Sequence, residues 1–167
     1  MRNSKLLQRE DGVKITVITV NFNNLNGLKR TIPSVFSQTY NQYEYIIVDG
    51  GSTDGSKEYI EQYSPLIDEW VSEPDKGVYN AMNKAIKMAH GEFCIFMNSG
   101  DHFYSPTVLD EVLPSLNDAD IYTGYTLRIG DKQVDIWAPP VELDMHFMMY
   151  ESLSHQATFT RTSILKE

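Results

Sequence analysis

The sequence alternates short apolar runs with segments of helical periodicity, and this alternation constrains the fold more than any other feature. Four runs rich in β-branched and aromatic residues are typical of strands, at residues 15–20, 45–48, 69–72 and 93–97. Between them, apolar residues recur at steps of three and four, the spacing of one helix face. Strands that alternate with helices favour parallel pairing, because each parallel connection needs a crossover. The sequence therefore predicts an α/β fold with a mostly parallel central sheet and helices on both faces.

Two of the predicted helices carry local signals at their starts. The helix at residues 25–36 contains Pro33, which predicts either a kink or a later start. The helix after Gly55 is expected to take its N-terminal cap from Ser52 or Thr53, since hydroxyl side chains satisfy free helix N–H groups.

The last third of the chain follows a different pattern. Pro106 suits the first turn of a helix that runs to about Leu116. Two further extended segments, residues 121–127 and 133–137, resemble a hairpin. We therefore expect a small antiparallel addition to the main sheet in the C-terminal third.

Composition limits the class of protein. A chain of 167 residues with 41% hydrophobic residues suits one compact domain, which we place at residues 14–167 after a flexible arm at residues 1–13. The net charge of -9 excludes a strongly basic nucleic-acid binder. The lone Cys94 indicates a reducing compartment, and no apolar run reaches the length of a membrane span. We expect a cytoplasmic protein, or one peripheral to the inner face of the membrane, and leave its oligomeric state open.

Polar side chains follow each of the four predicted strands. They are Asn21, Asp49, Glu73, Asp75 and the run Asn98, Ser99, Gly100 and Asp101. In an open α/β sheet, ligands bind beyond the carboxyl ends of the strands. Carboxylates that converge there repel each other unless a cation intervenes, and their oxygens suit Mg²⁺ or Mn²⁺. The same residue types are common in turns, so the pattern alone leaves a purely structural role open for each.

Several familiar sites find no support in the sequence. It contains no G-x-G-x-x-G after the first strand, no phosphate-binding G-x-x-x-x-G-K-[ST], and no G-x-S-x-G. Its four histidines lack zinc-site spacing, and Cys94 falls within a strand expected to be buried.

Ordered motifs along the chain resemble the family-2 glycosyltransferases, which have the Rossmann-like, A-type glycosyltransferase fold. The resemblance covers about residues 14–110 and is carried by residues 15–23, 34–40, 45–55, 75–85 and 97–101, with a weaker echo at 154–159. Residues 75–85 and 97–101 are similar to a subgroup of the family whose members are associated with bacterial surface polysaccharides. It implies transfer of a sugar, with inversion, from a nucleoside-diphosphate sugar to a saccharide or lipid-linked acceptor. A UDP-sugar is the favoured donor.

The resemblance also implies residue roles. The nucleotide-sugar-binding set would be Val20, Asn21, Phe22, Asp49, Asp75, Asn83, Lys84 and Asn98. Within that set, Phe22 would face the base, and Asp49 would accept a hydrogen bond from it. Asp101 would hold the divalent cation, Mn²⁺ or Mg²⁺, which would offset the charge that develops on the departing diphosphate.

Two departures from the family pattern bear on these roles. Asn98 and Gly100 stand where many members carry acids, so metal binding would depend on Asp101. Met82 stands where many carry an arginine that contacts the diphosphate, and Lys76 or Lys84 would be the substitute.

The sequence does not identify a catalytic base. In the family it lies downstream of the segment that resembles residues 154–159, and Glu151 and His155 are the nearby substitutes. We therefore expect a chain that is truncated on its acceptor side. Two alternatives remain: a catalytically incomplete nucleotide-binding fragment, or a Mg²⁺-binding regulatory α/β domain, although the latter usually has paired acids after its first strand.

Overall fold

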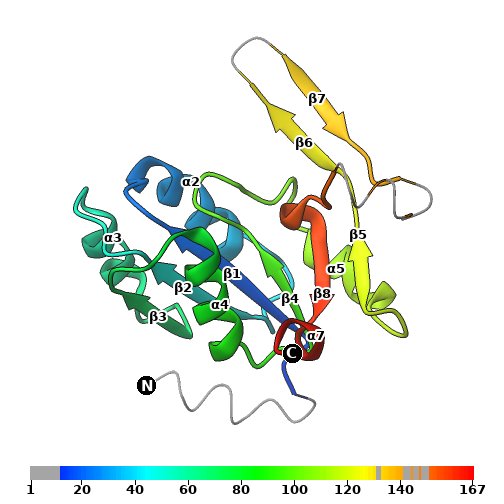
Figure 1. The fold of residues 1–167 in the computed structure, drawn as a ribbon, viewed down its shortest axis with the longest axis horizontal. Helices are drawn as coiled ribbons and strands as arrows, with labels where there is room; N and C mark the ends of the chain where they lie inside the picture. The colour runs from blue at the N-terminus through cyan, green and yellow to red at the C-terminus, as the bar shows by residue number, and fades with distance from the viewer. Residues whose placement is uncertain (1–11, 131–132, 141–143, 145–146, 148–150) are drawn as a thin grey trace.

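The computed structural model describes residues 12–130, 133–140, 144, 147 and 151–167. Within these residues the chain forms a six-stranded sheet between helices and a separate two-stranded hairpin (Figure 1). The predicted flexible arm at residues 1–13 lies almost wholly outside the described residues.

The main sheet has the strand order β3-β2-β1-β4-β8-β5. Its strands are β1 (Ile15–Asn21), β2 (Glu44–Asp49), β3 (Glu69–Ser72), β4 (Phe93–Phe96), β5 (Ile121–Thr123) and β8 (Thr158–Arg161). The first four strands pair in parallel, whereas β8 runs antiparallel to both β4 and β5. The predicted mostly parallel sheet is thus confirmed.

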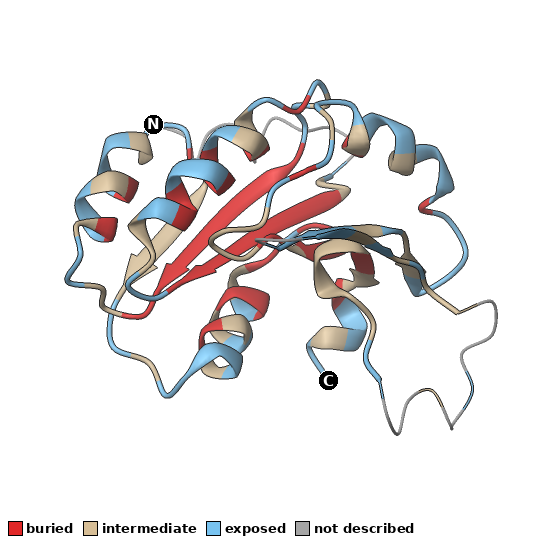
Figure 2. Ribbon diagram, turned by 90° about the horizontal axis from the view of Figure 1, so that it is seen from above, coloured by how far each residue is buried: buried red, intermediate tan, exposed pale blue. Residues whose placement is uncertain are grey.

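Helices cover both faces of this sheet, as predicted (Figure 2). One face packs against α2 (Leu25–Phe36), α3 (Ser56–Tyr63) and α5 (Val108–Val112), and the other against α4 (Val78–Met88) and α7 (Thr162–Leu165). Every residue of β1 and β2 is buried. Alternate side chains supply the two cores, so Val17 packs toward α2 while Ile18 packs toward α4.

Helix α2 begins directly after its N-cap residue and well before Pro33. Asn24 is the N-cap of α2, and its side-chain oxygen accepts a hydrogen bond from Gly27 N at 3.0 Å. The helix continues through Pro33, so the predicted later start is excluded.

The cap of α3 differs from the prediction. Gly55 is the N-cap at a φ of +92°, where a glycine has little strain, and the Asp54 carboxylate accepts a hydrogen bond from Ser56 N at 3.1 Å. The predicted cap by Ser52 or Thr53 is wrong, because the Ser52 hydroxyl is bound to a buried carboxylate at the end of β2.

The C-terminal third contains the predicted antiparallel hairpin with different bounds. The hairpin pairs β6 (Thr126–Ile129) with β7 (Val134–Trp137). The extended segment predicted at residues 121–127 is divided, because β5 joins the main sheet and Gly124 N donates to Ala157 O at 2.8 Å before β6 begins.

The helix predicted from Pro106 to Leu116 is also shorter. It comprises α5 and a 3₁₀ helix, η1 (Leu113–Ser115), since Pro114 has no N–H to continue the α-helical hydrogen bonds. Among the described helices, none combines the length and the apolar character needed to cross a bilayer.

Candidate active site

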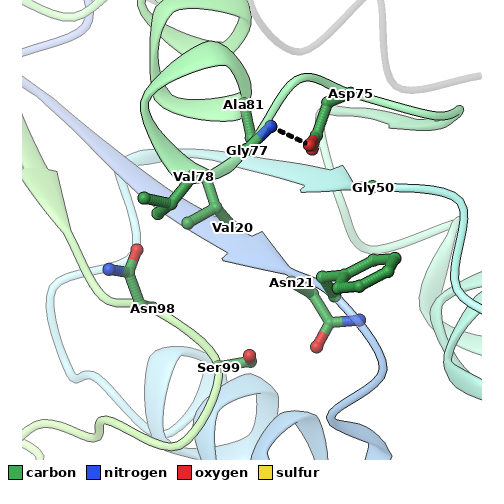
Figure 3. Close-up of a pocket in the computed structure, with 10 residues that line it drawn as sticks. Val20, Asn21, Gly50, Asp75, Gly77, Val78, Ala81, Asn98 and Ser99 are labelled. Carbon is green, nitrogen blue, oxygen red and sulfur yellow. Dashed lines mark hydrogen bonds between the residues drawn. The ribbon is translucent and has the colours of Figure 1, made fainter.

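A pocket of about 430 Å³ lies at the carboxyl ends of the parallel strands (Figure 3). Residues from the ends of β1, β2 and β4 and from the start of α4 form it, namely Val20, Asn21, Phe22, Gly50, Asp75, Gly77, Val78, Ala81, Asn98 and Ser99. Small-molecule sites commonly have volumes of about 300–1,000 Å³ and occur at this edge of α/β sheets. The position and size of the pocket therefore suit a small organic ligand.

One wall of the pocket depends on the absence of a side chain at Gly50. A Cβ there would lie 2.8 Å from Asp75 Oδ2 and 3.2 Å from Phe22 Cδ2. The Phe22 ring is 65% exposed, and Asp75 Oδ1 accepts a hydrogen bond from Gly77 N at 2.8 Å. Gly50 thus allows an exposed aromatic face and a carboxylate to approach the same strand end.

The pocket residue Asn21 belongs to a hydrogen-bond network around the Asp49 carboxylate. Oδ1 accepts from Asn21 Nδ2 at 2.7 Å and from Ser52 Oγ at 2.5 Å. Oδ2 accepts from Ser52 N at 2.9 Å and from Ser72 Oγ at 2.6 Å. The side chain is fully buried. Burial on its own raises the pKa of Asp49, but the hydrogen bonds from Ser52, Ser72 and Asn21 outweigh it and hold the pKa below its ordinary value.

The loop after β4 is fixed to helix α2 by a buried threonine. Thr31 Oγ1 donates to Asp101 O at 2.7 Å and accepts from Gly100 N at 2.9 Å. Asn24 Nδ2 also donates to Ser99 O at 2.8 Å. These bonds explain why a loop with little apolar content has one defined conformation at the rim of the pocket.

Asp101 belongs to this loop, and His155 lies against it. His155 Nε2 lies 2.9 Å from Asn98 Nδ2, and it belongs to the 3₁₀ helix η2 (His155–Ala157). Burial raises the pKa of Asp101, while His155 and a hydrogen bond from Gln156 oppose that shift. Burial lowers the pKa of His155, and the charge of Asp101 opposes that shift. Both groups are thus held closer to their neutral forms than they would be in water.

The structure brings five of the nine predicted site residues to one pocket. These are Val20, Asn21, Phe22, Asp75 and Asn98. Asp49 and Asp101 do not line the pocket, but each is bound to a residue that does: Asp49 Oδ1 accepts from Asn21 Nδ2, and Asp101 N donates to Asn98 O. Asn83 is exposed on α4 and does not line the pocket, and Lys84 forms an ion pair with Glu73 Oε1 at 2.8 Å.

Two pocket residues, and one residue that supports the pocket through Asp49, were not identified from the sequence. Val78 and Ala81 come from the first turns of α4, and Ser72 completes the network around Asp49. For Val78 and Ala81 the available signal was their position just after Gly77, where a helix start faces the strand ends. Ser72 offered a weaker signal as the last residue of a predicted strand.

The side chains near Asp101 include oxygen atoms of the kind that Mn²⁺ and Mg²⁺ prefer. Within the described part of the chain, no cluster of three or more His, Cys, Asp or Glu side chains could hold a metal. Asp101 supplies a carboxylate, and the buried Asn98 Oδ1 has no hydrogen-bond partner among the described residues. These two oxygens fit a cation that takes its remaining ligands from a substrate, whereas the lone pair of His155 Nε2 already accepts from Asn98 Nδ2.

The fold and the pocket together define an α/β protein with a cavity at the carboxyl edge of its sheet. The sequence model of glycosyl transferase family 2 matches residues 16–164. The chain therefore belongs to glycosyl transferase family 2.

Two curated relatives of this chain are described as glycosyltransferases. An uncharacterized glycosyltransferase of Mycobacterium tuberculosis is 41% identical over 104 residues, which cover 62% of this chain and 40% of the relative. A putative teichuronic acid biosynthesis glycosyltransferase of Bacillus subtilis, TuaG, is 32% identical over 123 residues. These residues cover 70% of this chain and 48% of TuaG. The chain thus spans roughly half the length of the curated relatives that it matches.

Solved structures support the A-type glycosyltransferase fold. Residues 1–349 of TarS from S. aureus, in complex with UDP, give a TM-score of 0.73 at 22% identity, covering 92% of this chain and 48% of that chain. The mannosyltransferase PcManGT from Pyrobaculum calidifontis, in complex with GDP-Man and Mn²⁺, gives a TM-score of 0.59 at 22% identity. The match covers 74% of this chain and 40% of that chain. At these identities the likeness concerns the fold alone.

Proposed function

We propose that this chain binds the donor in a glycosyltransferase that moves a sugar from a nucleoside-diphosphate sugar to an acceptor hydroxyl, with inversion, in polysaccharide or glycolipid biosynthesis. One observation carries the proposal: side chains from separate segments, including Phe22, Asp75 and Asn98, line a single pocket beside Asp101. Family membership and the surface-polymer description of TuaG support the same reaction class.

The donor's nucleoside lies against the end of β1 in this proposal. The exposed ring of Phe22 offers a face for the base, and the Asp75 carboxylate across Gly50 suits the ribose hydroxyls. A UDP-sugar is the favoured donor, since TarS is described in complex with UDP and with UDP-GlcNAc.

Asp101, together with Asn98 Oδ1, would hold a divalent cation beside the diphosphate. When bound, Mn²⁺ or Mg²⁺ supplies positive charge where the leaving diphosphate gains negative charge. The local need for a cation is strong because the chain has a net charge of -9 and its donor is itself an anion.

In this reaction the acceptor oxygen forms a bond to the anomeric carbon from the face opposite the diphosphate, and the bond to the diphosphate oxygen breaks. A general base takes the proton of the acceptor hydroxyl. The structure gives no reason to assign that base to Glu151, which is exposed, or to His155, whose Nε2 already lies 2.9 Å from Asn98 Nδ2. The acceptor would be a saccharide or a lipid-linked saccharide, and the location cytoplasmic or peripheral to the inner face of the membrane.

Isothermal titration calorimetry tests the proposal with UDP, GDP, CMP and dTDP, each with and without Mn²⁺. We expect Mn²⁺-dependent binding of a nucleoside diphosphate, weakened about tenfold to a hundredfold in Asp101→Ala. Asp118→Ala is the matched control, because this acid is exposed and remote in sequence from the pocket residues. Absence of nucleotide binding under every condition would overturn the proposal.

A turnover assay with nucleotide sugars separates the transferase from its main alternative. Nucleotide binding without transfer in a chain extended to the length of the relatives would favour a catalytically incomplete nucleotide-binding protein. Transfer to an acceptor would exclude it.

A further inference from the structure

Polar side chains spaced seven residues apart join helix α2 to the segment that follows β4. Asn24, the N-cap of the helix, donates from Nδ2 to Ser99 O at 2.8 Å. Gln38, just beyond the end of the helix, donates from Nε2 to Ser105 O at 2.7 Å. Thr31 lies midway between them and contacts the same segment. Seven residues make almost two helical turns, so this spacing keeps polar groups on one side of α2.

Thr31 makes the central attachment with a single hydroxyl. The residue is 0% exposed, and its Oγ1 donates to Asp101 O at 2.7 Å and accepts from Gly100 N at 2.9 Å. Asn98 O lies 3.3 Å from the same oxygen. Asp101 N in turn donates to Asn98 O at 2.9 Å, so residues 98–101 form a β-turn. The hydroxyl therefore meets main-chain atoms at three of the four positions of this turn.

This turn carries side chains that the proposed function needs. Asn98 and Ser99 line the pocket, and Figure 3 shows both on the loop after β4. Asp101 ends the turn and is the candidate ligand of the divalent cation. Because the sequence Asn-Ser-Gly-Asp contains no apolar side chain that could anchor it in the core, the place of the turn depends on its polar partners.

We propose that Thr31 is a positioning residue, whose hydroxyl fixes the main chain of Asp101 and thereby the place where the Asp101 carboxylate meets the divalent cation. This inference rests on the proposed function, since it requires a cation at Asp101. The buried Thr31 side chain acts only through the turn. Groups that orient a metal ligand matter nearly as much as the ligand, and their loss typically weakens metal binding by about tenfold to a hundredfold.

Two substitutions separate the hydroxyl from the rest of the side chain. Thr31→Val keeps the shape but leaves Gly100 N and Asp101 O without their partner in a buried setting. Thr31→Ser keeps the hydroxyl and loses the methyl group. If the hydroxyl positions the turn, the first substitution disturbs the cation site and the second spares it. If the side chain only fills space, both substitutions act alike.

Thr16 provides the matched control, because it is a second buried threonine with the same pattern of hydrogen bonds. It is 0% exposed, its Oγ1 donates to Glu44 Oε2 at 2.6 Å, and the same atom accepts from Gly91 N at 2.9 Å. Thr16 lies near the start of β1, whereas the pocket lies at the end of that strand. Thr16→Val should therefore lower the melting temperature without changing the cation site.

Calorimetric titration with UDP at a series of Mn²⁺ concentrations gives the Mn²⁺ concentration that half-saturates nucleotide binding. GDP replaces UDP if the wild type prefers it. We expect Thr31→Val to raise this concentration about tenfold to a hundredfold. Thr31→Ser and Thr16→Val should stay close to the wild type. Thr31→Cys, whose thiol is only a weak donor and acceptor, replaces Thr31→Val should that variant fail to fold.

Amide hydrogen exchange without Mn²⁺ gives a second readout. Gly100 N–H should exchange faster in Thr31→Val than in the wild type or in Thr31→Ser. Unchanged exchange would overturn the inference, because the hydroxyl would then not hold the turn in solution.

The Mn²⁺ titrations can overturn the inference in two further ways. The first is an unchanged Mn²⁺ requirement in Thr31→Val. The second is an equal rise in Thr16→Val or in Thr31→Ser, which would reduce the effect to a general loosening of the fold. Failure of the proposed function is distinguishable, because the wild type would then bind no nucleoside diphosphate at any Mn²⁺ concentration.

Discussion

His155 Nε2 lies 2.9 Å from Asn98 Nδ2, although 57 residues separate the two in the chain. The contact joins the end of β4, in the parallel half of the sheet, to η2, which precedes the antiparallel strand β8. The rim of the candidate active site is therefore built from both parts of the fold.

A double-mutant cycle on Asn98 and His155 measures this junction. We expect Asn98→Ala and His155→Ala to destabilise the protein, with a coupling free energy of about 0.5–1.5 kcal/mol, because the two side chains share one half-buried hydrogen bond. Urea unfolding of the two single variants and the double variant gives the coupling. Strictly additive effects would mean that the two side chains do not interact in solution.

Gly50→Ala is expected to impair nucleotide binding more than folding. The added Cβ would lie 2.8 Å from Asp75 Oδ2 and must displace the carboxylate or the Phe22 ring. We expect the affinity for the nucleoside diphosphate to fall by about tenfold, which corresponds to roughly 1.4 kcal/mol. Calorimetry measures the affinity, and thermal melting measures the stability of the variant.

Gly124→Ala is the matched control for that substitution. Among the described residues, its Cβ would meet only Ala157 O, at an ordinary 3.8 Å. Equal losses of affinity in both glycine variants would show that the close approach at Gly50 is not what shapes the binding wall.

The central sheet could be predicted because its strands carry their own signal. The residues of β1 and β2 are apolar or β-branched almost throughout, as buried parallel strands require. The division of residues 121–127 could not be predicted, since it depends on pairing between β5 and β8, 35 or more residues later in the chain. Local patterns do not encode such distant partners.

The candidate site could be predicted in part for a similar reason. Residues at the ends of parallel strands share one edge, so Asn21, Asp75 and Asn98 were expected to converge. The state of Asp49 could not be predicted, because its burial depends on Ser72 of a neighbouring strand. Lys84 could not be assigned either, since its ion pair with Glu73 depends on how the segment after β3 lies relative to α4.

Asp49 should contribute to stability as well as to the site. Asp49→Ala leaves the donors of Asn21, Ser52 and Ser72 without their acceptor in a buried setting. We expect a loss of about 2–4 kcal/mol in the free energy of unfolding. Urea unfolding at neutral pH measures it, with the exposed Asp118→Ala as the control, for which we expect a change within about 0.5 kcal/mol.

The contribution of Asp49 to the free energy of unfolding should also depend on pH, and it should decrease in acid. Its pKa is lowered in the folded state, so the ionised form stabilises the fold. That stability is fully present above the ordinary aspartate pKa of about 3.9 and is lost as the pH falls through the lower folded value. The difference in stability between wild type and Asp49→Asn should therefore shrink in acid and stay constant from pH 5 to 7. A difference that grows in acid would contradict the assignment.

Cys94 should resist thiol reagents for as long as the sheet stays closed. The side chain is 1% exposed on β4, and burial raises the pKa of its thiol to about 11, although the hydrogen bond with Thr162 opposes the shift. At pH 8 the reactive thiolate is therefore scarce in the folded protein. We expect labelling by 5,5′-dithiobis-(2-nitrobenzoic acid) to be about a hundredfold or more slower in buffer than in denaturant. Rapid labelling of the native chain would show instead that the seam between β4 and α7, where Thr162 lies, opens readily.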